Sequence, residues 1–143
     1  MRPTSIVRFE QVYLAEVLLG VINWLLLWDT LNAAYASDPN GAMLGPGFLI
    51  GSLVFSLTIS LLLWFFTARQ GSNIARWILV IFLIVGLMST AYSFAVGAEA
   101  PGISGFLSVV ATALQIAALY FLFRPDARAW FADGEEISAD TFE

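Results

Sequence analysis

Four long apolar runs constrain the fold of this sequence more than any other feature. They cover residues 12–31, 47–67, 77–96 and 105–123, and none of them contains arginine or lysine. Each run has about 20 residues, enough at ~1.5 Å rise per residue for a helix to cross a ~30 Å hydrocarbon core. A buried helix of a soluble protein would keep a polar face, whereas residues 54–66 and 77–88 are apolar nearly all round. We therefore predict that lipid surrounds most of the chain.

The connections between the runs are short and rich in turn-forming residues. DPNG lies within 32–46 and GPG covers 45–47 at its end, GSN lies within 68–76, and PG lies within 97–104. Connections this short make successive helices antiparallel neighbours. The sequence thus predicts an all-α transmembrane four-helix up-down bundle, formed by residues 1–132.

Every basic residue lies on one side of this predicted bundle. Two arginines precede the first run, two lie between the second and third runs, and two follow the fourth run: Arg2, Arg8, Arg69, Arg76, Arg124 and Arg128. The other two loops carry only Asp38 and Glu99. Because short cytoplasmic loops are enriched in Arg and Lys, we predict that both termini are cytoplasmic, in a bacterial inner membrane.

Composition excludes several classes of function. The chain is 59% hydrophobic, against roughly 45–50% in soluble domains, and it has no cysteine and no histidine. Disulfides, thiolate nucleophiles, Ser-His-Asp triads and the usual ligands of haem, zinc and iron–sulfur clusters are therefore absent. We predict no catalytic residues, no metal site and no cofactor.

The net charge of -5 comes from the end of the chain. Before residue 133 six acidic residues balance six arginines, and the remaining five acids lie in 133–143. Basic residues are not clustered, so we expect no nucleic-acid partner. Pro125, Asp126, Trp130 and Phe131 favour a short interfacial helix at about 125–131. Residues 133–143 are predicted to be a disordered acidic tail, either a solubilising end or a docking segment for a cytoplasmic partner.

The first run has an alternative interpretation as a cleaved signal peptide. Arg2 and Arg8 precede it, and Ala34-Tyr35-Ala36 before Ser37 resembles a cleavage site. Glu10 and Glu16 argue against this, as does an apolar stretch longer than the usual ~7–15 residues. We therefore expect the first run to be retained as a span.

Glu16 is the first candidate for chemistry, because a charged carboxylate within the apolar core costs free energy unless it is paired or protonated. Helical spacing puts Glu16, Gly20 and Asn23 on one face, and Gln115 of the fourth run lies at a comparable depth. We predict an intramembrane polar site of Glu16, Asn23 and Gln115. Its structural interpretation is that Glu16 hydrogen-bonds to Gln115, Tyr13 or a nearby arginine and fixes helix register. Its functional interpretation is a proton or cation site.

Small residues recur at helical spacing and predict close helix packing. Gly47 and Gly51 form a GxxxG step. The predicted packing residues are Gly47, Gly51, Ser52, Ser56, Ser60, Ser89, Ser93, Ser108 and Thr112. Whether one of these seams faces a second copy or another protein stays open.

Two stretches resemble known families. The sequence YLAEVLLG at 13–20 is locally similar to the first helix of small multidrug resistance transporters, and this resemblance implies proton exchange at Glu16. RPTSIVRFEQVYL at the start and YFLFRPDARAWF at the end resemble small four-span proteins of bacterial inner membranes that have no assigned activity. That resemblance implies the fold and the location, and no catalytic residues.

Two functions follow as hypotheses. The first is a non-enzymatic accessory or interaction protein of the inner membrane, whose partners are membrane lipid and a homo-oligomer or larger membrane complex. The alternative is a small proton-coupled transporter or channel-like homo-oligomer that uses Glu16, supported by Asn23 and Gln115.

Overall fold

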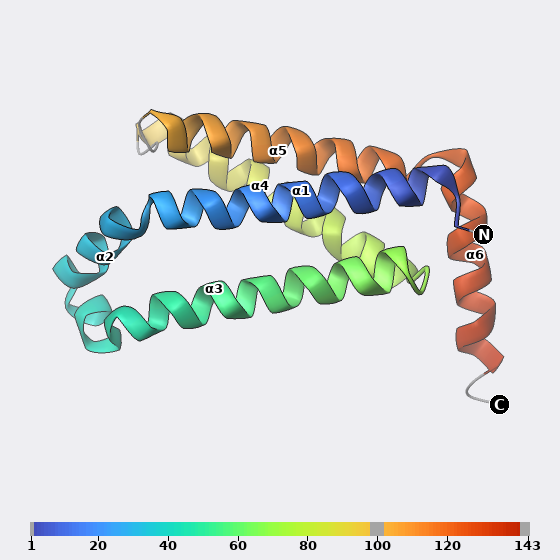
Figure 1. The fold of residues 1–143 in the computed structure, drawn as a ribbon, viewed down its shortest axis with the longest axis horizontal. Coiled ribbons are helices and arrows are strands. Elements are labelled where there is room, and N and C mark those ends of the chain that lie inside the picture. The colour runs from blue at the N-terminus through green and yellow to red at the C-terminus, as the bar shows by residue number, and fades with distance from the viewer. Residues whose placement is uncertain (1, 98–101, 141–143) are drawn as a thin grey trace.

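The computed structural model describes residues 2–97 and 102–140, and this part of the chain is helical without strands (Figure 1). Glu99 lies outside it. The helices are α1 (Thr4–Leu26), α2 (Trp28–Ser37), α3 (Pro39–Ala68), α4 (Asn73–Val96), α5 (Ile103–Leu122) and α6 (Pro125–Asp140). The prediction of an all-α chain is confirmed for the described residues.

Local chemistry sets several of the helix ends. The Ser72 hydroxyl accepts a hydrogen bond from the Ala75 amide at 3.3 Å and so caps the start of α4. Gly97 ends that helix in the left-handed region, at φ +65°. Pro39 and Pro125 occupy first helical positions, where the missing N–H of proline leaves no hydrogen bond unmade.

The four long helices alternate in direction (Figure 1). α1 packs most extensively against α5 and also contacts α3, while α4 contacts α3 and α5. α6 crosses the end of this arrangement where α1 begins and α5 ends, and it contacts α1, α4 and α5. The short connections therefore join antiparallel neighbours, as their lengths predicted.

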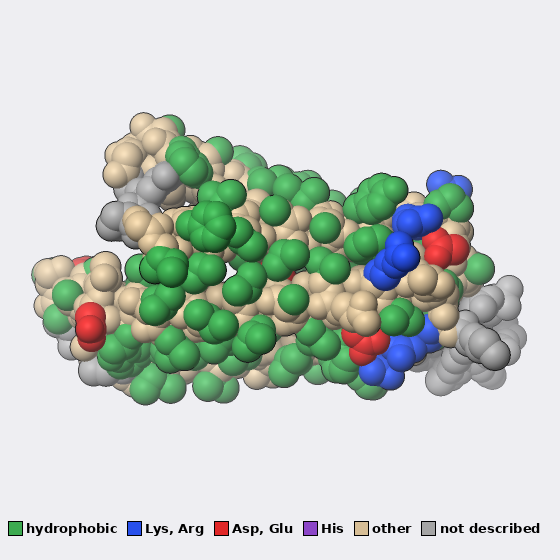
Figure 2. All heavy atoms as spheres, turned by 45° about the horizontal axis from the view of Figure 1, so that its top comes forward, with side chains coloured by type: hydrophobic (Ala, Val, Ile, Leu, Met, Phe, Trp, Pro, Cys, Tyr) green, Lys and Arg blue, Asp and Glu red, His purple; other side chains and the backbone are tan. Residues whose placement is uncertain are grey.

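Helix length and hydropathy identify a multi-pass membrane protein. Among the described residues, Gly47–Ala68, Asn73–Val96 and Ile103–Leu122 are each long and apolar enough to cross a membrane. α1 and α2 provide a fourth crossing if together they form one bent span. Hydrophobic side chains cover the long sides of the molecule, and the arginines gather toward the end that carries α6 (Figure 2).

The first run is not one straight helix over 12–31. α1 begins at Thr4 and ends at Leu26, and α2 follows at an angle of 59° after Leu27, whose φ and ψ are −90° and 2°. The Leu27 amide still donates to the Asn23 carbonyl at 3.0 Å, and its carbonyl accepts from the Leu31 amide at 2.8 Å. The bend therefore leaves both backbone groups of Leu27 hydrogen-bonded.

The connection 32–46 contains more helix than its turn residues predicted. α2 extends to Ser37 and α3 begins at Pro39, with an interruption at Gly45, whose φ of +67° is accessible to glycine at little cost. The rings of Tyr35 and Phe48 lie 5.8 Å apart, and a Cβ on Gly41 would lie 2.5 Å from the Tyr35 carbonyl oxygen. Close packing of α2 on the start of α3 thus replaces an open loop.

α6 is longer than the predicted helix at 125–131. We expected disorder over 133–143, whereas the helix continues to Asp140, and residues 141–143 lie outside the described part. The first turn carries Asp126, which suits the positive end of the helix dipole.

Buried apolar side chains gather at the α6 end of the molecule. The cluster contains Ile6, Phe9, Tyr13, Leu63, Ala68, Ala75, Leu79, Ala118, Leu119, Leu122, Ala127 and Phe131. Toward the opposite end most large apolar side chains are exposed, as on α3 and α4. The helices are therefore packed most tightly at the arginine-bearing end.

Candidate polar groove between α1 and α3

Glu16 lines a cavity of about 390 Å³ between α1 and α3. α1 contributes Glu16, Val17, Gly20, Val21 and Trp24, and α3 contributes Ser52, Leu53, Ser56, Leu57 and Ser60. We call this cavity the α1/α3 groove. Its walls combine small side chains with one carboxylate and one large aromatic ring.

The Glu16 carboxylate has no hydrogen-bond or ion-pair partner among the described residues. Tyr13, one of its expected partners, donates instead to the Ser60 carbonyl at 3.1 Å. The cost of a charged carboxylate at the centre of a span is about 2.5–3.5 kcal/mol. We therefore expect Glu16 either to be protonated or to bind a hydrogen-bond donor from outside the described residues.

Asn23 points away from this groove and toward α5. Its side-chain amide donates to the Ser108 hydroxyl at 3.1 Å, and that hydroxyl donates to the Ser104 carbonyl at 3.0 Å. Thr112 donates in turn to the Ser108 carbonyl at 2.9 Å. Only the bond from Asn23 crosses from α1 to α5, since the other two lie within α5.

Gln115 does not join Glu16. Its side-chain oxygen lies beside Gly86 of α4, 3.9 Å from where a Cβ on that glycine would be. The predicted three-residue site is thus divided: Glu16 faces α3, Asn23 faces α5, and Gln115 lies near α4. Depth in the membrane had suggested that these residues meet, but depth does not determine which neighbour a helix face contacts.

The predicted small-residue seams have different surroundings. Ser89 and Ser93 of α4 line a cavity of about 150 Å³ together with Ser108 of α5. On α3, a Cβ added at Gly47 or Gly51 would meet no atom within 4 Å. Ser52 and Ser56 are exposed along the α1/α3 groove, and Ser60 lies at its end nearer α6. The GxxxG step of α3 therefore faces open space instead of another helix of the described chain.

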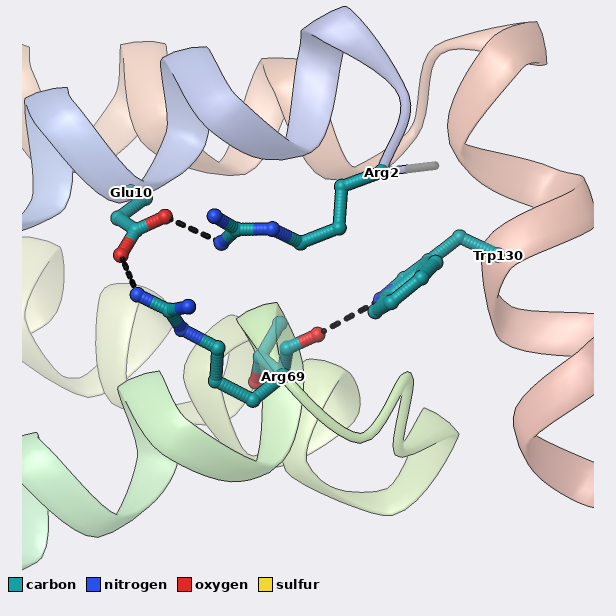
Figure 3. A network of polar contacts seen from close by, with 5 residues as sticks. Arg2, Glu10, Arg69 and Trp130 are labelled. Carbon is teal, nitrogen blue, oxygen red and sulfur yellow. Dashed lines mark hydrogen bonds and ion pairs between the residues drawn. The ribbon is translucent and has the colours of Figure 1, made fainter. Parts of the chain in front are cut away.

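A second polar cluster lies at the arginine-bearing end (Figure 3). Glu10 bridges two arginines: Arg2 Nη1 lies 2.5 Å from one carboxylate oxygen and Arg69 Nη2 lies 2.7 Å from the other. The Glu10 side chain is only 14% exposed, so this bridge ties the end of α3 to the start of α1 in a partly dry setting. Sequence reasoning missed it, because Arg69 is remote in the sequence.

Replacing Glu10 by glutamine is expected to lower the free energy of unfolding by about 1 kcal/mol, since Arg69 is partly exposed and screened. The effect should shrink as ionic strength rises. Chemical unfolding of the purified protein in detergent at low and high salt measures both. An unchanged stability in Glu10→Gln would mean that the bridge contributes nothing.

α6 docks on the bundle through apolar, aromatic and hydrogen-bonding contacts. Ala127 and Phe131 are buried, and Trp130 Nε1 donates to the Thr67 carbonyl at 3.2 Å (Figure 3). The Arg76 guanidinium lies 4.6 Å from the centre of the Phe131 ring. At the start of the helix, Asp126 Oδ2 accepts from the Ser5 amide at 3.2 Å. α6 is therefore held at both its first and its second turn.

Asp126 makes this docking dependent on pH. Hydrogen bonding from Ser5, followed by the charge of Arg124, holds the pKa of the Asp126 carboxyl below its usual value. The stabilisation is thus fully present above the unfolded pKa of ~3.9 and is lost as pH falls through the lower folded pKa. Protease cleavage within α6 should increase over that range, and Asp126→Asn should flatten the response. Equal pH dependence in both proteins would contradict this role.

The comparisons with known proteins leave the family undetermined. No family model matches the chain, and neither a curated protein nor a solved structure is similar to it. Among the described residues, no group of three or more acidic side chains is arranged to hold a metal ion. The functional argument therefore depends on the geometry of the chain itself.

Proposed function

We propose that this protein is a non-enzymatic interaction protein of a bacterial inner membrane, and that the α1/α3 groove receives a transmembrane helix of a different protein. The observation that carries the proposal is the Glu16 carboxylate, which lines the groove without a partner among the described residues. An acid in this setting favours binding of a hydrogen-bond donor or a cation.

The proposed orientation puts both termini in the cytoplasm, with four crossings of the membrane. The bent α1–α2 pair would form the first of these crossings. All six arginines lie toward one end of the long helices: Arg2 and Arg8 before or in the first turns of α1, Arg69 and Arg76 just after α3 or in the first turn of α4, and Arg124 and Arg128 after α5. This arrangement supports the orientation through the positive-inside rule. The terminal patterns that resemble small four-span inner-membrane proteins agree with this location.

The shape of the groove suits a helix. Its α3 wall carries Ser52 and Ser56, and its α1 wall carries Gly20, where an added Cβ would meet no atom within 4 Å. Small side chains allow helix backbones to approach closely in lipid, where van der Waals contact drives association. An entering helix would approach most closely if it also presented small residues to this groove.

Charge selects the partner. The four apolar runs of this chain contain no lysine or arginine, so a second copy offers Glu16 no basic residue from within a span. A different protein whose span carries Lys or Arg would give the carboxylate a charged partner, which no apolar run of this chain can supply. We therefore propose a hetero-complex, with a homo-oligomer as its competing outcome.

Photocrosslinking in native membranes tests this partner. A photoreactive amino acid at Ser56 should give one adduct with a different membrane protein, and Glu16→Leu should remove it while Glu16→Gln retains part of it. The matched control is Val54, which is exposed on the same helix but does not line the groove. Equal adducts from both positions would contradict the proposal, and an adduct with the chain itself would assign the homo-oligomer instead.

A second candidate function uses the same carboxylate. Glu16 lines a cavity beside the Trp24 ring, an arrangement that suits a proton or an organic cation, as in a small proton-coupled transporter or channel-like homo-oligomer. The local resemblance of residues 13–20 to small multidrug resistance transporters supports it. Proton release on addition of an organic cation to the purified protein, abolished by Glu16→Gln, would favour transport. No release from the unmodified protein would exclude it.

A further inference from the structure

A second cavity is lined by other residues than the α1/α3 groove. It has a volume of about 450 Å³ and lies where α1 and α6 both begin. Its lining residues are Thr4, Ser5, Arg8, Arg124, Pro125 and Asp126. We call it the α1/α6 cavity. None of these residues lines the groove that contains Glu16.

The cavity has positive charge available to a ligand. Arg8 is exposed and has no ion-pair partner among the described residues. Arg124 approaches Asp126 only through Nε, at 3.7 Å, which leaves its terminal nitrogens to other contacts. Asp126 is already compensated, since its other oxygen accepts from the Ser5 amide. Two guanidinium groups that line the cavity are therefore available to an anion, while the Asp126 carboxylate already has partners.

Uncharged hydrogen-bond donors at the same cavity add to its attraction for an anion. The N-termini of α1 and α6 both open onto it, and the residue before α1, Pro3, has no side chain that can cap the helix. Ser5 is 2% exposed, and its hydroxyl oxygen has no hydrogen-bond partner in the described chain, where the hydrogen bond to Asp126 comes from the Ser5 amide. This buried hydroxyl therefore leaves a donor that a ligand in the cavity can use.

We propose that the α1/α6 cavity binds the phosphate of an anionic phospholipid headgroup, through Arg8, Arg124 and the Ser5 hydroxyl. The cavity lies at the arginine-bearing end of the long helices, which the proposed orientation puts in the cytoplasmic headgroup layer. Guanidinium groups match the geometry of phosphate oxygens, and an anionic lipid keeps a net negative charge that a zwitterionic lipid lacks. This inference does not depend on the function proposed for Glu16.

Native mass spectrometry of the full-length protein in detergent tests the site with phosphatidylglycerol and phosphatidylcholine as probes. Phosphatidylglycerol should remain bound in preference to phosphatidylcholine. Arg8→Gln and Arg124→Gln should each weaken its binding about fivefold, as expected for one basic residue near an anionic headgroup. Arg128→Gln is the matched control, because Arg128 lies on the same end of the molecule but does not line this cavity.

Ser5→Ala distinguishes specific binding in the cavity from general attraction of lipid to surface charge. It removes no charge and no hydrogen bond within the described chain, so it should reduce phosphatidylglycerol binding while leaving thermal stability unchanged. Equal losses in Arg128→Gln and Arg8→Gln would overturn the site. Preferential binding of inorganic phosphate, with lipid binding unaffected by Arg8→Gln and Arg124→Gln, would assign a soluble anion and overturn the lipid.

Discussion

Phe131→Ala is expected to lower the free energy of unfolding by about 3 kcal/mol and to release α6 from the end of the bundle. The ring is 1% exposed and lies against the Arg76 guanidinium, so truncation leaves a cavity and removes a cation–π contact. Chemical unfolding in detergent measures the stability, and limited proteolysis reports the release of α6.

The matched control for this variant is Phe106→Ala. Phe106 lies on α5 and is 67% exposed, where the same truncation removes contact with lipid or detergent alone. It should change stability by well under 1 kcal/mol. Similar losses in the two variants would show that α6 is not docked through Phe131.

Gly71→Ala is the second change with a large expected effect. Gly71 has φ +64°, and an added Cβ would lie 2.5 Å from the Trp130 carbonyl oxygen, so this alanine is both strained and in collision with α6. Left-handed backbone costs alanine about 1 kcal/mol, and displacement of α6 should bring the total to about 3 kcal/mol. Unfolding in detergent measures the total.

Gly97→Ala is the matched control, because it has the same backbone cost without the contact between Gly71 and Trp130. Gly97 has nearly the same φ, +65°, but an added Cβ would meet no atom within 4 Å. This variant should lose only about 1 kcal/mol, the cost of the backbone conformation. If both alanine variants lost the same stability, the contact between the α3–α4 connection and Trp130 would not hold α6.

The apolar runs predicted the long helices well, because period and length are properties of each segment alone. Residues 47–67, 77–96 and 105–123 all correspond to helices of the structure, and the arginine-bearing connections lie at one end. Hydropathy could not reveal the bend at Leu27, since apolar residues lie on both sides of it and its hydrogen bonds are kept. Nor could acidic composition reveal that α6 extends to Asp140.

The candidate site was harder to predict than the fold. Glu16 was singled out as an acid within the first apolar run, and in the structure it faces α3 and not α5, because helix rotation depends on packing around the whole bundle. The bond between Asn23 and Ser108 follows from the same rotation. The Glu10 bridge needs Arg69, which is brought close only by the antiparallel return of α3.

Buried residues are concentrated at one end of the molecule. Close packing at the arginine-bearing end fixes α1, α3, α5 and α6 relative to one another. Away from that end, Gly20, Gly47 and Gly51 face open space. The protein thus has a firmly packed base at the α6 end and an open groove between α1 and α3.

Cysteine accessibility in intact cells tests the membrane arrangement most directly, since the chain has no cysteine of its own. Ser37→Cys at the end of α2 and Gln70→Cys between α3 and α4 are both exposed positions on opposite ends of the spans. A membrane-impermeant maleimide reagent, applied after the outer membrane is opened, should label Ser37→Cys at once and Gln70→Cys only after the inner membrane is permeabilised. Labelling of both positions in the same compartment would contradict the transmembrane arrangement.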